Sequence, residues 1–349
     1  MQNTIVEVPP LKSLINPADG FQKKHLADYK LDVLALCGFG CLYCSSNTGN
    51  YLRIHQDEFA KCTEDQLGRA IKPTDDPALM LVWPDVVSQL KAELKTKPKC
   101  FGAGKTLVFS MLTDGFSPYF VKEGITRKIL ELVLEKTSFR IRVLTKNATV
   151  GSKTWVKFFA DHKDRFVVGL STGSLDDTWT QKMELGTSKP SARFKALANL
   201  QEAGVPTFGM LCPVFPDMLK GDSLETMLDM INPDLVEHVW AEPYNDRINW
   251  RLVRNSFPAG SATYDWFTII YEYHQTDLWS SYAAELYSRI RLKAIEEGWS
   301  SKLKYLLYED LVSSGDAAAF QGLHGVLLQS NPDANGFSKN PVLAAMQGK

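Results

Sequence analysis

Short apolar runs alternate with helical patterns over most of the chain. Runs rich in β-branched and aromatic residues predict six strands, at 31–36, 106–111, 140–145, 166–171, 207–213 and 235–241. Apolar residues at helical spacing predict five helices between them, at 85–94, 120–135, 153–161, 192–203 and 224–231. For the fourth helix, Ser191 can cap the start and Gly204 supplies the stop. The pattern therefore indicates a series of strand–helix units.

This alternation determines the expected fold class, which is α/β. Strands that alternate with helices form parallel sheets through right-handed crossovers, so the pattern predicts a wound sheet or a barrel. Six units are too few for the common eightfold closure, and we expect an open, partial (β/α)6 barrel. In such folds the chemistry gathers at the carboxyl ends of the strands. Residues that follow the predicted strands are therefore the first candidates for a functional site.

The pattern changes after Ala241, which suggests how the chain is divided. Three aromatic-rich segments predict further helices, at 264–273, 279–297 and 302–311. We expect three parts: an N-terminal extension at 1–30, a core domain at 31–245, and an α-rich C-terminal cap with a polar tail at 246–349. Within the core domain, residues 45–84 contain several prolines and are expected to form a long loop with short helices.

The composition is that of an ordinary globular protein. Of the 349 residues, 44% are hydrophobic and 23% are charged, which is ample apolar material for a large core. A formal net charge of −1 gives no global attraction to nucleic acid or anionic lipid. No stretch is long and apolar enough to span a bilayer, and the first residues lack the pattern of a secretory signal. We therefore expect a cytoplasmic protein without a membrane partner.

Three of the six cysteines lie close together, directly after the first predicted strand. In Cys37-Gly-Phe-Gly-Cys41-Leu-Tyr-Cys44, two glycines allow the loop to fold around a bulky inorganic centre. Structural zinc sites and ferredoxin clusters use four protein ligands, whereas three thiolates leave one metal position open. A chance grouping of buried cysteines is the remaining alternative. The spacing favours an iron–sulfur centre with one iron available to another ligand.

The C-x3-C-x2-C spacing, with an aromatic residue before the last cysteine, resembles the signature of the radical SAM superfamily. The likeness extends over about residues 30–245 and looks closest to the branch that contains spore photoproduct lyase. Other segments carry it too: Phe109-Ser-Met-Leu-Thr-Asp-Gly115 with Pro118, Leu144-Thr-Lys146, Leu170-Ser171, and the stretch between Glu184 and Arg193.

The resemblance implies a [4Fe–4S] cluster on Cys37, Cys41 and Cys44, whose fourth iron binds S-adenosylmethionine (SAM). In this superfamily an electron from the cluster cleaves SAM to a 5′-deoxyadenosyl radical, which abstracts hydrogen from a substrate. A flavodoxin or ferredoxin is the usual reductant. The residues that the resemblance implies for SAM are Tyr43 at the adenine through its backbone, Thr113 and Asp114 at the amino group or ribose, Lys146 at the carboxylate, and Ser171 at the ribose or carboxylate.

Each of these SAM contacts has a structural alternative. Asp114 before Gly115 also suits a turn, Ser171 could satisfy backbone groups at a strand end, and Lys146 could be a solvated surface residue. All three lie at carboxyl ends of predicted strands, where the cysteine loop also emerges. This convergence favours the SAM-binding interpretation.

The sequence departs from spore photoproduct lyase at two positions. Met111 stands where the lyase has a hydrogen-donating cysteine, and Ser45 replaces the tyrosine after the third cluster cysteine. We therefore expect a radical SAM enzyme with another substrate, which is a small molecule, a peptide or a nucleic acid. Candidate substrate-site residues are Cys212, Tyr244 and Arg247. Two alternatives stay open: a lyase-like DNA repair enzyme, and a non-catalytic iron–sulfur or zinc protein that binds nucleic acid.

Overall fold

The structure is a computed structural model that describes residues 3–48, 56–246, 248–307, 312 and 314–328. The chain divides into two compact units, and neither unit is one continuous stretch. Unit 1 comprises residues 1–170, 177–206 and 247–249; unit 2 comprises 171–176, 207–246 and 250–349. Both units are built from parallel strands connected by helices.

Unit 1 contains a sheet in which β2, β3, β6, β7 and β8 are neighbours in that order. β3, β6, β7 and β8 are parallel, and β2 is antiparallel to β3. Every residue of β8 is buried, which is typical of a parallel strand. The bounds are β2 (Ile15–Pro17), β3 (Tyr29–Leu31), β6 (Thr106–Phe109), β7 (Arg140–Thr145) and β8 (Phe166–Ser171).

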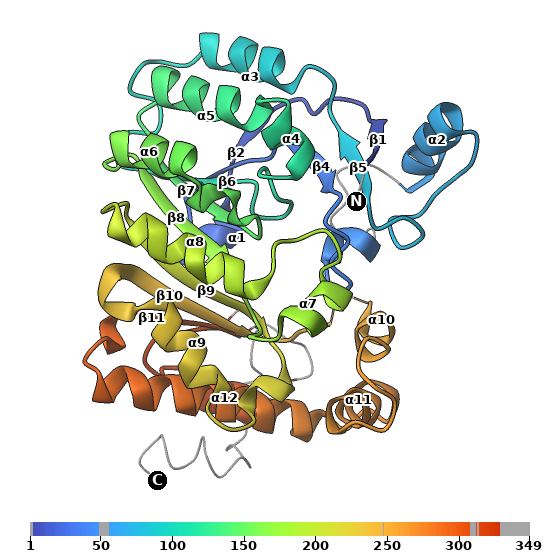
Figure 1. The fold of residues 1–349 in the computed structure, drawn as a ribbon, viewed down its shortest axis with the longest axis vertical. Helices are drawn as coiled ribbons and strands as arrows, with labels where there is room; N and C mark the ends of the chain where they lie inside the picture. The colour runs from blue at the N-terminus through green and yellow to red at the C-terminus, as the bar shows by residue number, and fades with distance from the viewer. Residues whose placement is uncertain (1–2, 49–55, 247, 308–311, 313, 329–349) are drawn as a thin grey trace. The chain divides into compact units, whose positions relative to one another are not determined.

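Helices of unit 1 connect these strands. Figure 1 shows α3 (Val86–Lys95) and α5 (Ile125–Lys136) packed side by side. In α5, Ile129, Leu130 and Val133 are buried, so an apolar face holds the helix against the rest of the unit. The other helices and helical turns are α1 (Asp19–Gln22), η1 (Ser45–Thr48), α2 (Gln56–Leu67), α4 (Pro118–Lys122), η2 (Ala148–Gly151), α6 (Lys153–Asp161), α7 (Asp177–Met183) and α8 (Pro190–Glu202).

A second, smaller sheet in unit 1 leads the chain into the cysteine motif. β1 (Thr4–Glu7) pairs in parallel with β5 (Leu79–Val82), and β5 pairs antiparallel with β4 (Leu34–Cys37). The backbone of Cys37 lies opposite Met80 in this pairing. The first cysteine of the motif is therefore fixed at the end of a paired strand.

This smaller sheet contradicts two expectations from the sequence. The strand predicted over 31–36 is two short strands in different sheets: Leu31 lies opposite Phe109 in the larger sheet, whereas Leu34 lies opposite Val82 in the smaller one. The stretch 45–84 was predicted as a loop with short helices, yet it contains the twelve-residue helix α2 and strand β5. The apolar run Leu79–Val82 is fully buried, and so short a run can be assigned to a strand only when the strands that pair with it are known.

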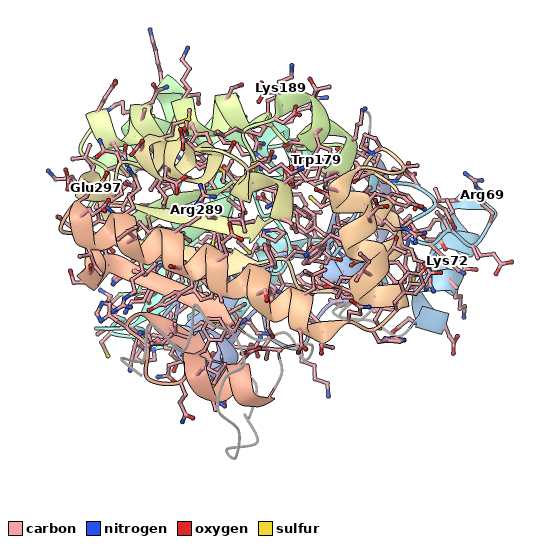
Figure 2. All side chains as sticks on the ribbon, turned by 90° about the horizontal axis from the view of Figure 1, so that it is seen from below. Arg69, Lys72, Trp179, Lys189, Arg289 and Glu297 are labelled. Atoms are coloured by element: carbon pink, nitrogen blue, oxygen red, sulfur yellow. The ribbon has the colours of Figure 1, made fainter. Side chains whose placement is uncertain are left out.

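Unit 2 contains four parallel strands in the order β9, β10, β11, β12. Figure 1 shows α9 and the long helix α12 running along them. Arg289 of α12, labelled in Figure 2, forms an ion pair with Glu225 of α9. The strands are β9 (Thr207–Val214), β10 (Val236–Pro243), β11 (Leu303–Leu307) and β12 (Val326–Leu328). The helices and helical turns are η3 (Pro216–Leu219), α9 (Ser223–Ile231), η4 (Pro233–Leu235), α10 (Trp250–Arg254), α11 (Ala262–Phe267), the π-helix η5 (Thr268–Glu272), α12 (Thr276–Glu296), η6 (Ser300–Lys302) and α13 (Ser314–Phe320).

The predicted α/β class, with parallel sheets and connecting helices, is confirmed. β7, β8 and α6 have the predicted bounds. In neither unit do the described strands close into a barrel. Among the helices that the structure describes, none combines the length and the apolar character needed to cross a membrane.

Three local expectations are wrong, each for a local reason. The helix predicted over 302–311 contains strand β11, because a short apolar run does not by itself distinguish helix from strand, and 308–311 lie outside the described residues. The helix predicted over 120–135 is interrupted at Gly124, whose φ is +69°. α8 begins at Pro190 rather than after Ser191, and the Ser191 hydroxyl donates to Asp177 instead, at 2.6 Å.

Candidate metal and cofactor site

The three motif cysteines line one pocket in unit 1. Two glycines shape the loop that carries them: Gly38 and Gly40 have φ values of +69° and +60°. A Cβ on Gly38 would lie 2.5 Å from Cγ of Met80, and one on Gly40 would lie 2.5 Å from Cβ of Pro77. Glycine is therefore required at both positions for the loop to adopt this path.

The segment after α7 holds the cysteine loop from one side. Cys41 forms an isolated antiparallel bridge with Glu184, and on either side of this bridge Leu42 N donates to the Met183 carbonyl at 2.9 Å and Gly186 N donates to the Phe39 carbonyl at 2.9 Å. A Cβ on Gly186 would lie 3.1 Å from the Gly38 carbonyl oxygen, so the two backbones approach closely. The cysteine loop and residues 183–186 thus form a short ladder.

The surroundings of the cysteine thiols favour thiolates bound to a metal centre over free thiolates. Burial raises the pKa of Cys37 to about 12 and raises that of Cys41 well above its ordinary value, because apolar surroundings disfavour a free thiolate. Direct bonding to iron or zinc stabilises a thiolate in such surroundings. Among the described residues, no three His, Cys, Asp or Glu side chains converge on a point suited to a single metal ion. A cluster does not require such convergence, since each thiolate bonds a different iron, and three soft donors around one pocket fit it.

Asp114 connects the ends of β6 and β7. Its Oδ1 accepts from Phe116 N at 2.9 Å, and its Oδ2 accepts from Lys146 N at 2.8 Å. The Thr145 hydroxyl lies 2.9 Å from both carboxylate oxygens. Burial raises the pKa of Asp114, although these donors oppose the shift. The carboxylate therefore holds the loop after β6 to the end of β7, and its predicted contact with SAM stays a prediction. Thr113, also predicted at SAM, donates from its hydroxyl to the Leu34 carbonyl at 3.3 Å.

Lys146 is a mostly buried member of a charged cluster, with 14% of its side-chain surface exposed, and not a solvated surface residue. Its Nζ lies 3.6 Å from Oε1 of Glu184 and 5.5 Å from the centre of the Tyr43 ring. The Tyr43 hydroxyl donates to the same oxygen of Glu184, while Arg193 donates to Oε2. Burial opposes ionisation of Glu184, but the charges of Arg193 and Lys146 outweigh it and lower the pKa of this carboxyl to about 2. The structure thus brings Tyr43 and Lys146 together beside the cysteine loop.

The comparisons with known proteins concern the fold and part of the chain. No family model matches this chain. The uncharacterized protein ORF301 of Acidianus two-tailed virus is 24% identical over 148 residues, which cover 41% of this chain and 48%, or about half, of the viral protein.

Two solved proteins illustrate the structural likeness. Spore photoproduct lyase complexed with dinucleoside spore photoproduct has a TM-score of 0.43 and 14% identity, over 72% of this chain and 66% of the lyase. The histidine-tagged form of anSMEcpe with bound AdoMet has a TM-score of 0.43 and 12% identity, over 85% of this chain and 64% of that chain.

Ser171, the last residue of β8, belongs to unit 2, as do the candidates Cys212 in β9 and Tyr244 after β10. The Ser171 hydroxyl donates to the Cys212 carbonyl at 2.9 Å, and the Cys212 thiol donates to Oε2 of Glu242 at 3.0 Å. Asn245 donates to the other oxygen of Glu242, and its own Oδ1 is buried with no hydrogen-bond partner among the described residues. Unit 2 therefore brings Ser171 and Cys212 together.

Tyr244, a candidate for the substrate site, is fully buried among aromatic side chains of unit 2. Its ring stacks on Phe215, with 5.5 Å between ring centres, and its backbone carbonyl accepts from the Trp279 indole at 2.9 Å. Its hydroxyl donates to Asp246 at 3.3 Å. These contacts are those of a core residue. Arg247, the third candidate, lies outside the described residues.

The structure adds residues that the sequence did not single out. Asn249 is buried, and its side-chain amide donates to the Cys44 carbonyl at 3.3 Å. Thr187 lies within the charged cluster, with its hydroxyl 3.2 Å from Oε2 of Glu184. Asn249 and Cys44 are 205 positions apart, so no local spacing signals their contact. Thr187 lies inside the stretch that resembles the family, but nothing in its own pattern marks it.

Proposed function

We propose that this chain is a radical SAM enzyme that holds a [4Fe–4S] cluster on Cys37, Cys41 and Cys44 and binds SAM at the fourth iron. When bound, the cluster supplies the electron that cleaves the carbon–sulfur bond of SAM, giving methionine and a 5′-deoxyadenosyl radical that abstracts hydrogen from a substrate. One observation carries the proposal: the three thiols of the C-x3-C-x2-C motif line a single pocket in unit 1.

The chain's own residues prepare the site for an anionic ligand. Lys146 presents an ammonium group beside the cysteine loop, where it would bind the methionyl carboxylate of SAM. The backbone of Tyr43 would lie against the adenine. Asp114 holds the β7 end that carries Lys146, and Thr113 is tied to the end of the smaller sheet at Leu34. These roles follow from the family motif and from the contacts described above.

Several parts of this function are proposals from the sequence alone. Ser171 would contact the ribose or carboxylate of SAM, and a flavodoxin or ferredoxin would supply the electron. The substrate is a small molecule, a peptide or a nucleic acid. The core domain at 31–245, the helical cap at 246–349 and a cytoplasmic location stay predictions as well.

The proposal is tested by anaerobic reconstitution with iron and sulfide, followed by dithionite and SAM. We expect the wild type to bind a cluster and to release 5′-deoxyadenosine, measured by liquid chromatography. Cys41→Ala should lose the product, because one thiolate of the motif is missing. A wild-type protein that holds a cluster and forms no 5′-deoxyadenosine contradicts the proposal.

A further inference from the structure

Glu184 uses its two carboxylate oxygens for different purposes. The side chain is almost fully buried in unit 1, and its backbone is bridged to Cys41. Oε2 faces Arg193 and Thr187, whereas Oε1 faces Tyr43 and Lys146. One oxygen therefore contacts the residues that anchor the carboxylate, and the other contacts residues of the candidate site.

The Oε2 side is a fixed part of the fold. The Arg193 side chain is fully buried, and its Nε donates to the Ser188 carbonyl at 2.7 Å. Its Nη2 donates both to Oε2 and to the Thr187 hydroxyl, the latter at 2.5 Å. Ser188 N in turn donates to the carbonyl of Lys146 at 3.1 Å. Because Arg193 binds the segment 187–188 as well as the carboxylate, Glu184 cannot rotate without breaking several hydrogen bonds.

The Oε1 side is arranged for contact with another group. The Tyr43 hydroxyl, which belongs to the cysteine loop, donates to this oxygen. The Lys146 ammonium lies 3.6 Å away, farther than a direct hydrogen bond, and its side chain keeps 14% of its surface exposed. An ammonium group carries three N–H donors and a full positive charge, so it attracts an incoming carboxylate while the charge of Glu184 holds it in place.

We infer that Glu184 is a positioning residue, which fixes the cysteine loop through Tyr43 and places Lys146 for the carboxylate of the ligand. The inference rests on the proposed function for the identity of that ligand, SAM. The claim about the loop does not depend on it, because Cys41, Tyr43 and Cys44 occupy one short turn with Cys44 N donating to the Cys41 carbonyl at 3.0 Å. Loss of the carboxylate should therefore loosen the loop even without metal.

The first experiment measures thiol reactivity in the metal-free, reduced protein. Iodoacetamide labelling of Cys41 and Cys44 is followed by mass spectrometry, with the exposed Cys100 as the internal reference. In Glu184→Gln we expect labelling about fivefold faster than in the wild type, because local opening becomes easier. Glu225→Gln, which removes the charge of a Glu–Arg pair in unit 2, is the matched control and should label at the wild-type rate.

A second variant keeps this test decisive if Glu184→Gln folds poorly. Tyr43→Phe removes one donor to Oε1 and leaves the contact between Glu184 and Arg193 in place. We expect Cys44 to label about threefold faster in this variant, which should keep the wild-type circular dichroism and lose only a few degrees of melting temperature.

The last experiment measures SAM affinity by equilibrium dialysis on the cluster-loaded protein. Glu184→Gln and Lys146→Met should each weaken binding by about tenfold, and the double variant should be no weaker than either single one, because both changes remove the same contact. Wild-type labelling in both Glu184→Gln and Tyr43→Phe, or additive losses of affinity, overturn the inference. A cluster-loaded wild type that binds no SAM contradicts the proposed function instead, and the labelling result still decides the role of Glu184 in the loop.

Discussion

Two glutamate–arginine pairs, Glu184 with Arg193 in unit 1 and Glu225 with Arg289 in unit 2, are built differently. In unit 2, Arg289, which is labelled in Figure 2, donates to both oxygens of Glu225, with Nε 2.9 Å from Oε1 and Nη2 2.5 Å from Oε2. In unit 1, the Arg193 guanidinium donates to Oε2 of Glu184, and the Tyr43 hydroxyl and the Lys146 ammonium face Oε1. The first pair joins two helices, whereas the second joins the fold to the cysteine loop.

Burial separates the two pairs further. The side chains of Glu184 and Arg193 are 6% and 0% exposed, against 30% and 23% for Glu225 and Arg289. Desolvation of a buried pair offsets most of its Coulomb attraction, so such a pair contributes little net stability over apolar residues of similar size. Stability alone therefore does not explain why a buried ion pair occurs at this place in unit 1. The position of the pair beside the cysteine thiols agrees with the positioning role that we infer for Glu184.

The largest expected difference between the pairs follows removal of the arginine. Arg193→Met leaves the buried carboxylate of Glu184 without its main partner, and we expect a loss of about 3–5 kcal/mol in the free energy of unfolding. Arg289→Met should lose about 1 kcal/mol, because water can solvate Glu225. Urea unfolding followed by circular dichroism measures both. Equal losses would show that the pair in unit 1 is not isolated from solvent.

Acid should remove the contribution of Glu184. Its pKa is lowered from the ordinary 4.5 to about 2, so its stabilising contribution is complete above pH 4.5 and is lost as the pH falls toward 2. The shift corresponds to about 3 kcal/mol between the ionised and protonated forms. We expect the wild type to be more stable than Glu184→Gln at neutral pH and the two proteins to converge in acid, measured by urea unfolding. A constant gap would mean that the charge of Glu184 is not what stabilises the wild type.

Asp114 supplies an intermediate case, since it is buried but has only neutral donors. In Asp114→Asn the amide keeps one acceptor oxygen and places an N–H₂ group against Phe116 N or Lys146 N. We expect a loss of about 1–3 kcal/mol in the free energy of unfolding. Asp177→Asn is the matched control. Asp177 accepts from the hydroxyl and the backbone N–H of Ser191 in an exposed setting, so its replacement should lower the free energy of unfolding less than Asp114→Asn does. A larger loss in the control would exclude a special role for burial at Asp114.

The sequence predicted the elements whose pattern is local. β7, β8 and α6 have the expected bounds because each is a compact run with clear ends. The short strands β5 and β11 were missed, and β3 and β4 were predicted as one strand, because their pairing depends on segments far away in the chain. A run of four or five apolar residues satisfies helix and strand equally until its neighbours are known.

The same limit applies to the candidate site. The cysteine spacing marked the thiols, and the positions after the strands marked Asp114 and Lys146. The link between Tyr43 and Glu184 joins residues 141 positions apart, and no periodicity encodes it. Sequence also favoured a SAM contact for Asp114, whereas the structure shows the hydrogen bonds of a turn and a strand end. A turn and a SAM contact both favour an aspartate at this position, so the identity of the residue does not distinguish the two roles.

The smallest expected effect is that of Glu225→Gln, and it completes the contrast between the two pairs. The amide can still accept from Arg289, and this arginine also donates to the carbonyls of Leu219 and Gly221 at 2.5 and 2.6 Å. We expect a loss of about 0.5 kcal/mol that disappears at high salt, because the pair is partly exposed and screened. Glu184→Gln should keep its loss at high salt, since ions do not reach a buried charge. Unfolding in urea at low and high sodium chloride measures both, and a salt-dependent loss in Glu184→Gln would place its charge in contact with solvent and remove the physical basis for its positioning role.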